Sequence, residues 1–336
     1  MSEFPSPSAV QGPPPMGVFT AVLISPDGTH RVLSPEQAFT VQPGEGLVWL
    51  HLDRRNEAVL TWLYAHSGID EIDVEALLSE ETRPRAYRPR QQASLMVILR
   101  GVNNRAGCED DDLMSIRLWV EKHRVLSFSS RPMVPVEDVV KMLGGEYSPV
   151  NAAELLAALA TRMVAGMEPA IDALRDTLDE LEENMDAGRR IDLTRLMQVR
   201  RRGATLRRFL NPQKDVFVTI DSLHLPWLGI TAEEEWREAT NTLYRYIEDL
   251  EVVREGVQIL QDGLNQRIVA RANRTFYAVS VVAAFFVPLT FTTGLLGMNV
   301  GGIPGSQSPW GFAGVIAFLV SWSVIQYLVF RRLRWL

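Results

Sequence analysis

Cysteine is nearly absent from this sequence, and the pattern of a signal peptide is not seen in its first 16 residues. Cys108 is the only cysteine among the 336 residues, so no disulfide can form within the chain, and a reducing compartment is favoured for its soluble part. Residues 1–16 contain five prolines and have neither the basic start nor the apolar run of a signal peptide. We therefore expect a disordered tail over residues 1–16.

Charged residues are rare in the C-terminal part of the sequence. Residues 275–336 contain no acidic residue and only three basic ones, Arg331, Arg332 and Arg334. They include two uncharged runs of 21 residues each, 276–296 and 310–330, and about 20 apolar residues cross a bilayer as a helix. Because the two runs are adjacent and flanked by basic residues, we expect two transmembrane helices rather than helices buried in a soluble core.

The basic residues around these runs predict their orientation. Arg267, Arg271 and Arg274 precede the first run, and the basic tail 331–336 follows the second. Since basic residues collect on the cytoplasmic side, we expect an inner-membrane protein, in contact with membrane lipids, whose two termini are cytoplasmic and whose loop 297–309 is periplasmic.

Pro288 interrupts the first expected span. Proline has no backbone N–H, so the carbonyl of Ala284 loses its donor within the helix. Such a defect is tolerated in a membrane where a neighbouring helix or water replaces that donor.

The rest of the chain is acidic. Residues 1–274 carry 31 basic and 41 acidic side chains, a net charge of −10 with histidine neutral. Nucleic-acid-binding surfaces are basic, so we expect no nucleic-acid partner, whereas an acidic surface suits cations. The sequence contains no P-loop, HExxH, GxSxG or metal-spaced Cys/His cluster. We therefore expect no catalytic residues, no resident cofactor and no enzyme.

Residues 17–145 have the pattern of an α/β domain. Alternating or apolar β-rich runs predict strands at 18–24, 46–52, 93–102, 115–120 and 124–129, with helices at 57–66 and 73–78 between the second and third strands.

Helical periodicity follows this domain. Apolar residues at three and four spacing predict a helical hairpin over 150–211, with a break near Gly188 and a kink at Pro169. A last helix is expected to begin near Thr231, whose hydroxyl precedes three glutamates and suits an N-terminal cap. If it continues to Leu296, residues 231–275 form the cytoplasmic part of a stalk helix roughly 100 Å long.

Two helices per chain cannot enclose an aqueous path, so a pore requires several copies around an axis. One face of the first span carries small and weakly polar residues, which we expect to line such a pore. They are Gly294, Thr290, Val287, Ala283, Ser280 and Phe276. Ordinary packing of small residues between helices is the alternative. The second span is expected to face lipid through Phe312, Ile316, Leu319, Trp322, Tyr327 and Val329.

Two strings of residues are specific enough to point to a family. PLTFTTGLLGMN, from Pro288 to Asn299, and the terminal RRLRWL resemble the CorA superfamily of divalent-cation transporters. Within it, GMNVGGIPG is similar to the ZntB zinc-transporter branch. The resemblance implies a homopentamer with a funnel-shaped cytoplasmic domain, a pore lined by the first span, and a pore mouth or selectivity site at Gly297, Met298 and Asn299.

The resemblance makes chemical sense at Asn299. A ring of amide oxygens can hydrogen-bond the tightly held water shell of a divalent cation without removing it. The magnesium branch usually carries MPEL after GMN, whereas this loop has no carboxylate between Gly297 and Pro309. Zinc is therefore the expected cargo by resemblance, although the His and Cys ligands that zinc prefers are absent from the spans and the loop. Direction of transport and proton coupling stay open.

Other interpretations remain at this stage. A CorA-like magnesium or cobalt channel is one, and a membrane-anchored sensor without a pore is another. The five scattered histidines are expected to be structural or exposed, and Cys108 beside residues 109–112 is a solvated hairpin tip or, less favoured, a regulatory metal site.

The expected ion path continues below the membrane along one face of the stalk helix. Stepping inward from Phe276 gives Asn273, Val269, Gln266, Asp262, Ile259 and Glu255. We call Asn273, Gln266, Asp262 and Glu255 the polar stripe. Copies of Asp262 around an axis would concentrate dications, whereas solvated surface carboxylates are the alternative. Val257, Leu260 and Leu264 point away and are expected to pack against other helices.

Overall fold

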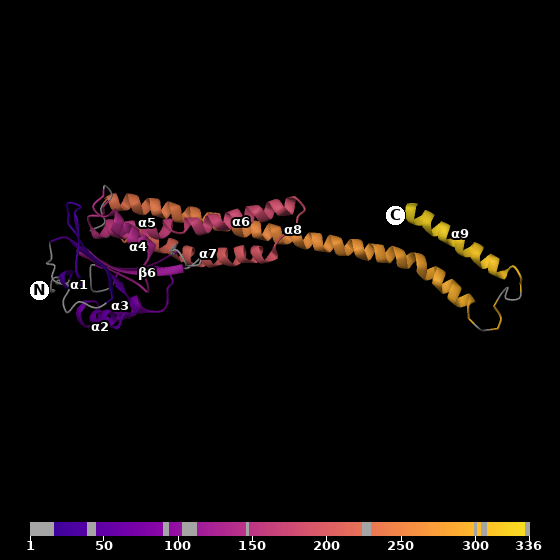
Figure 1. The fold of residues 1–336 in the computed structure, drawn as a ribbon, viewed down its shortest axis with the longest axis horizontal. Coiled ribbons are helices and arrows are strands. Elements are labelled where there is room, and N and C mark those ends of the chain that lie inside the picture. The colour runs from indigo at the N-terminus through magenta and orange to yellow at the C-terminus, as the bar shows by residue number, and fades with distance from the viewer. Residues whose placement is uncertain are drawn as a thin grey trace. The chain divides into compact units, whose positions relative to one another are not determined.

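The computed structural model describes residues 17–38, 45–89, 94–102, 113–145, 148–223, 230–298, 301–303 and 308–332. The tail expected over 1–16 lies outside these ranges. The chain divides into two compact units, Met1–Gln258 and Ile259–Leu336, each of which is described by itself (Figure 1).

The first unit contains a seven-stranded sheet in the order β2-β1-β3-β7-β6-β5-β4. The strands are β1 Val18–Ile24, β2 His30–Val32, β3 Leu47–Asp53, β4 Arg85–Tyr87, β5 Leu95–Val102, β6 Leu113–Glu121 and β7 Arg124–Ser129. Only β3 and β7 pair in parallel among them, and the other neighbours are antiparallel. All five predicted strands are present. The two that were missed, β2 and β4, are three-residue edge strands, too short for an alternating pattern to be seen.

Helices cover both faces of the sheet. The bounds are α1 Pro35–Ala38, α2 Glu57–His66, α3 Glu71–Leu78, α4 Val134–Met142 and α5 Ala152–Ala165. Helices α2 and α3 pack on one face, and α5, with α4 beside it, packs on the other (Figure 1). The first unit is thus a layered α/β domain, as the sequence predicts.

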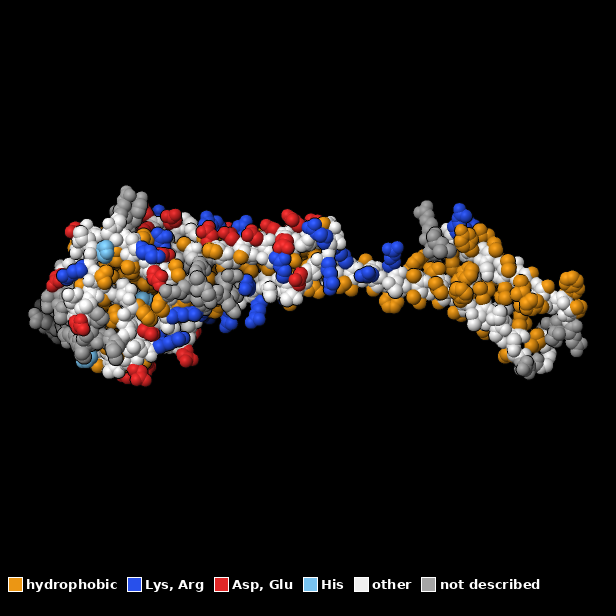
Figure 2. Space-filling view, viewed as in Figure 1, with side chains coloured by type: hydrophobic (Ala, Val, Ile, Leu, Met, Phe, Trp, Pro, Cys, Tyr) orange, Lys and Arg blue, Asp and Glu red, His pale blue; other side chains and the backbone are white. Residues whose placement is uncertain are grey.

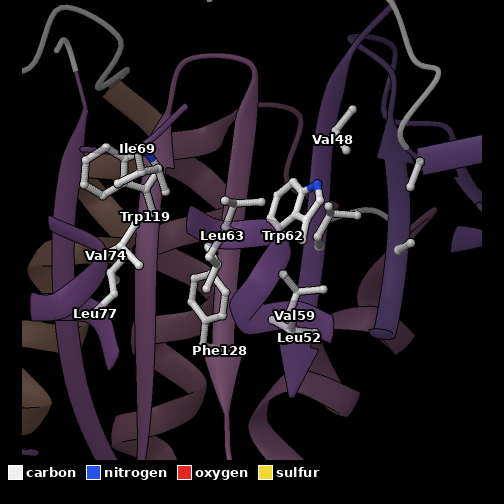
Figure 3. Close-up of a cluster of buried hydrophobic side chains, with 14 of the residues drawn as sticks. Val48, Leu52, Val59, Trp62, Leu63, Ile69, Val74, Leu77, Trp119 and Phe128 are labelled. Atoms are coloured by element: carbon white, nitrogen blue, oxygen red, sulfur yellow. The ribbon is translucent and has the colours of Figure 1, made fainter. Parts of the chain in front are cut away.

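The core beneath α2 and α3 is built from large apolar side chains of both layers (Figure 3). Trp62 and Leu63 from α2 lie beside Phe128 from β7, and Trp119 of β6 lies on the same face of the sheet. All four are at most 2% exposed. Burying side chains of this size contributes roughly 1.5–3 kcal/mol each, so this face anchors the domain.

A polar group is buried on the opposite face of the sheet. His51 is 1% exposed, its Nδ1 lies 2.9 Å from the hydroxyl of Ser127, and its Nε2 lies 3.1 Å from that of Ser129. The indole N–H of Trp49 also donates to Ser127, at 2.9 Å. Burial lowers the pKa of His51 to about 3, because the charged ring would lose its hydration. His51 is therefore a neutral core histidine.

The helical region after the sheet differs from the predicted hairpin. Its first arm is two helices, α5 and α6 (Glu168–Asp186), because α5 ends before Gly166 and Pro169 lies in the first turn of α6, where its missing N–H is tolerated. The predicted kink at Pro169 is therefore a break. The second arm, α7 (Leu193–Ser222), continues past Asn211 with Pro212 inside it.

Helix α8 runs over Ile230–Leu296, with Pro288 inside it. In the first unit it packs closely on α6, since a Cβ at Gly256 would lie 2.6 Å from Leu178 Cδ2. An ion pair between Arg175 Nη1 and Asp249 Oδ1, at 3.7 Å, joins the same helices. Val257 and Leu260 are buried, at 3% and 0% exposure, as expected for their side of the helix, whereas Leu264 is only half-buried.

The buried histidine predicts a change in acid stability. Because the pKa of His51 falls from 6.5 to about 3 on folding, the unfolded chain binds one more proton between these values. This contribution to stability is fully present above pH 6.5 and is lost as pH falls toward 3. We expect His51→Gln to remove up to about 1.4 kcal/mol per pH unit from the slope of unfolding free energy in that window.

Urea unfolding of the full-length protein in detergent between pH 4.5 and 7.5 measures this slope. His123→Gln is the matched control, because His123 is exposed between β6 and β7. An acid slope equal in the protein and in its His51→Gln variant contradicts the prediction.

Candidate ion pathway

The second unit contains the C-terminal part of α8 and the helix α9 (Gly311–Arg332). Both helices contain an 18-residue window apolar enough to cross a membrane, with mean hydropathy 2.0 in Ala232–Leu296 and 1.9 in Gly311–Arg332. Figure 2 shows hydrophobic side chains gathered over this unit, whereas acidic side chains gather on the first unit. These are the two spans predicted from the uncharged runs.

One stripe of each helix is less exposed than the rest. On α8 the half-buried positions are Val281, Ala284, Phe285, Pro288, Leu289, Thr292 and Leu296. On α9 the half-buried or buried positions are Gly311, Val315, Leu319, Ser323, Gln326 and Phe330. Spacing of three and four residues indicates that each stripe is one helix face, and the two faces are turned toward each other. Leu319, expected to face lipid, belongs instead to this contact.

A hydrogen bond joins the two faces at the proline. Gln326 Nε2 of α9 donates to the carbonyl oxygen of Ala284 in α8 at 3.1 Å. This carbonyl is the one that Pro288 deprives of a helical donor. The sequence predicts that a neighbouring helix or water replaces the lost donor, and in the structure a side chain 42 residues away donates to this carbonyl.

The face expected to line a pore is not covered by α9. All six of its residues, from Phe276 to Gly294, are exposed in the single chain. Phe276 is 71% and Val287 63% exposed, and a Cβ at Gly294 would meet no atom within 4 Å. Among the residues that the structure describes, none covers this face.

The outer end of α8 leads into the loop. The N–H of Gly297 donates to the carbonyl of Thr293 at 2.9 Å, closing the last turn, and Met298 is 50% exposed. Asn299 lies outside the described residues, as do Cys108 and residues 109–112. The expected mouth at Asn299 and the alternative metal site at Cys108 therefore stay predictions.

All four residues of the polar stripe are exposed. Glu255, Asp262, Gln266 and Asn273 all lie in the exposed class, and so do the intervening Ile259 and Val269. Ile268, four residues after Leu264 on the same side of the helix, is 65% exposed. Across the part of the chain that the structure describes, no three His, Cys, Asp or Glu side chains come together as a metal site.

The chain is similar to known proteins over most of its length. A family profile described as "CorA-like Mg²⁺ transporter protein" matches residues 44–332. The divalent cation transporter CmaX of Pseudomonas aeruginosa is 37% identical over 321 residues, which cover 95% of this chain and 96% of that protein. The zinc transport protein ZntB of Pectobacterium carotovorum is 28% identical over 297 residues, 88% of each chain.

Solved structures agree on the fold. The full-length CmaX structure superposes with a TM-score of 0.81 at 35% identity, covering 97% of this chain and all of that one. The CorA magnesium transporter of Methanocaldococcus jannaschii superposes with a TM-score of 0.75 at 19% identity, covering 94% of this chain and 98% of that one. The second likeness concerns the fold alone.

Proposed function

The chain belongs to the family of CorA-like Mg²⁺ transporter proteins, and on that premise we propose that it conducts hydrated divalent cations, zinc among them, through a pore built from copies of itself. The observation that carries this proposal is the uncovered face of α8. Six mostly small and weakly polar residues lie exposed along a helix whose other side packs on α9. A membrane helix leaves such a face open for lipid, for another copy or for water.

Water is the occupant that the chemistry of this face favours. Thr290 and Ser280 provide hydroxyls, Gly294 leaves the backbone accessible, and the whole stretch 276–296 has no charge. A dication with its water shell can pass neutral hydroxyls by exchanging hydrogen bonds, whereas fixed carboxylates would hold it tightly. The face thus suits a conducting path rather than a binding site.

The number of copies is proposed to be five. One chain supplies one pore-lining helix, which cannot surround an ion. Several copies around an axis are therefore required, and the resemblance to the superfamily supplies the number. The basic residues flanking both spans support insertion in the inner membrane with both termini in the cytoplasm.

Zinc is proposed as a cargo on two observations. Relatives named as zinc transport proteins align over 88% of this chain, and the loop carries no carboxylate between Gly297 and Pro309. The relative at 37% identity is named only a divalent cation transporter. A magnesium or cobalt channel is therefore the alternative, and the residues of the spans do not choose between them, because neither contains His or Cys.

Reconstitution into liposomes tests this function. With ion-sensitive dyes inside, we expect flux of Zn²⁺ to exceed flux of Mg²⁺ and Co²⁺, with and without a pH gradient. Asn299→Ala should abolish flux while the mass in detergent still corresponds to five copies, since no charged side chain in the loop can orient the hydrated ion in its place. Mg²⁺ flux above Zn²⁺ flux favours the alternative cargo, whereas a monomeric mass or no flux of any dication contradicts the proposal.

The polar stripe makes a second prediction. We propose that Asp262 copies form a negative ring below the membrane, which raises the local dication concentration. Asp262→Asn should slow flux about two- to threefold at 10 mM salt, and the difference should shrink above 150 mM, where the Debye length is about 8 Å. Asp221→Asn, on α7, is the matched control, since it removes an exposed carboxylate away from the stripe. Equal flux for Asp262→Asn at every salt concentration contradicts the ring.

A further inference from the structure

Gln326 is an unusual residue for the apolar second span. It is the only amide side chain in the second span, residues 310–330, and an amide inside a bilayer is unfavourable unless it is hydrogen-bonded. The two serines of the same helix donate their hydroxyl hydrogen bonds to backbone carbonyls of that helix. Ser321 Oγ donates to Ala317 O at 2.8 Å and Ser323 Oγ to Leu319 O at 2.8 Å, both within α9. Gln326 instead reaches across to another helix.

Its target is the carbonyl in the interior of α8 that Pro288 leaves without a helical donor. Pro288 cannot donate to Ala284 O, and its ring also crowds that carbonyl, which bends a helix at this point. The hydroxyl of Thr292 returns to Pro288 O at 2.8 Å and that of Thr293 to Leu289 O at 3.1 Å. Side chains of α8 thus bond to carbonyls beyond the proline, whereas Ala284 O is reached from α9.

The oxygen of the Gln326 amide, unlike its nitrogen, has no hydrogen bond to a described residue. Gln326 Oε1 is buried and has no hydrogen-bond partner among the described residues. Leaving a buried acceptor unpaired is unfavourable, so a glutamine that served only to fill space would be disfavoured here against an apolar residue of the same length. A glutamine at this position is explained if the hydrogen bond from its Nε2 to the carbonyl of Ala284 has a functional role.

We propose that Gln326 is a positioning residue that holds the bend of α8 at Pro288 and thereby aims the pore-lining face above and below it. This inference rests on the proposed transport function. The proline divides the exposed face into an outer part, with Thr290 and Gly294, and an inner part, with Ser280 and Ala283. A bond at Ala284, between the two parts, fixes the angle between them. Without it the angle between the two halves of the face would no longer be fixed.

A double-mutant cycle tests this role. Gln326→Met keeps the length of the side chain and removes its donor. Pro288→Ala restores a backbone N–H at position 288, which can donate to Ala284 O and makes the donor of Gln326 unnecessary. We therefore expect Gln326→Met to lower maximal dication flux about three- to twentyfold in the natural background, and less than about twofold in the Pro288→Ala background. The concentration of half-maximal flux should stay the same, because the bond lies away from the loop that recognises the ion.

Two measurements separate this role from simple stability. Flux per assembled protein is compared with the melting temperature in detergent, and both are analysed as a cycle. Ser323→Ala is the control on the same stripe of α9, since its hydroxyl bonds only within its own helix, and it should change neither quantity. Additive effects of the Gln326 and Pro288 substitutions on both quantities overturn the inference. Coupling in the melting temperature without coupling in flux also overturns it, because the bond is then only structural.

The inference and the proposed function fail in different ways. If the unmodified protein moves no dication, the function is wrong, while the cycle in melting temperature still decides whether the bond between Gln326 and Ala284 forms. If the unmodified protein conducts and Gln326→Met conducts equally well, the function stands and the positioning role is wrong.

Discussion

Every polar backbone group in the hydrocarbon region must find a partner within the protein, and the two C-terminal helices are arranged around this constraint. An α-helix satisfies it everywhere except at a proline, and Pro288 lies in the middle of the first span. The resulting open carbonyl at Ala284 is bonded by Gln326 from the second span. The pairing of α9 with one face of α8 leaves the opposite, small-residue face exposed. That face carries no charged side chain.

The acidic surplus of the chain precedes the apolar spans. It lies entirely before residue 275, and α8 carries polar side chains such as Asp262 and Gln266 on an exposed face ahead of the apolar run. The α/β layers are stabilised by apolar burial on both sheet faces and by a neutral His51 between two serine hydroxyls. In the described residues this domain holds no cluster of three or more metal-ligating side chains.

Much of the fold could be predicted from the sequence, for reasons that particular elements make clear. The bounds of β1, β7 and α2 match the predicted ranges, because apolar alternation and periodicity are strong there. The uncharged runs predict both spans, since length and absence of charge are local properties. The break between α5 and α6 was predicted as a kink, because Pro169 suits the first turn of a new helix as well as a bend in an old one. The partner of Ala284 could not be found from spacing, although a lone amide in an apolar span is a signal for it. The loop around Asn299 rests on resemblance, and its geometry lies outside the described residues.

The central claim is that one face of α8 is in contact with water in the assembled membrane protein. Single cysteines introduced along 276–294 in a Cys108→Ser background, treated with a charged, membrane-impermeant thiol reagent, test it most directly. Seven positions are compared, and all are exposed in the single chain, so exposure alone does not distinguish them. Four lie on the pore-lining face, namely Ser280, Ala283, Val287 and Thr290, and three lie off that face, namely Val282, Phe286 and Thr293. Contact of the pore-lining face with water predicts labelling and block of flux at the four positions on that face, and neither effect at Val282, Phe286 and Thr293. Uniform labelling around the helix, or labelling only at the last three, would contradict it.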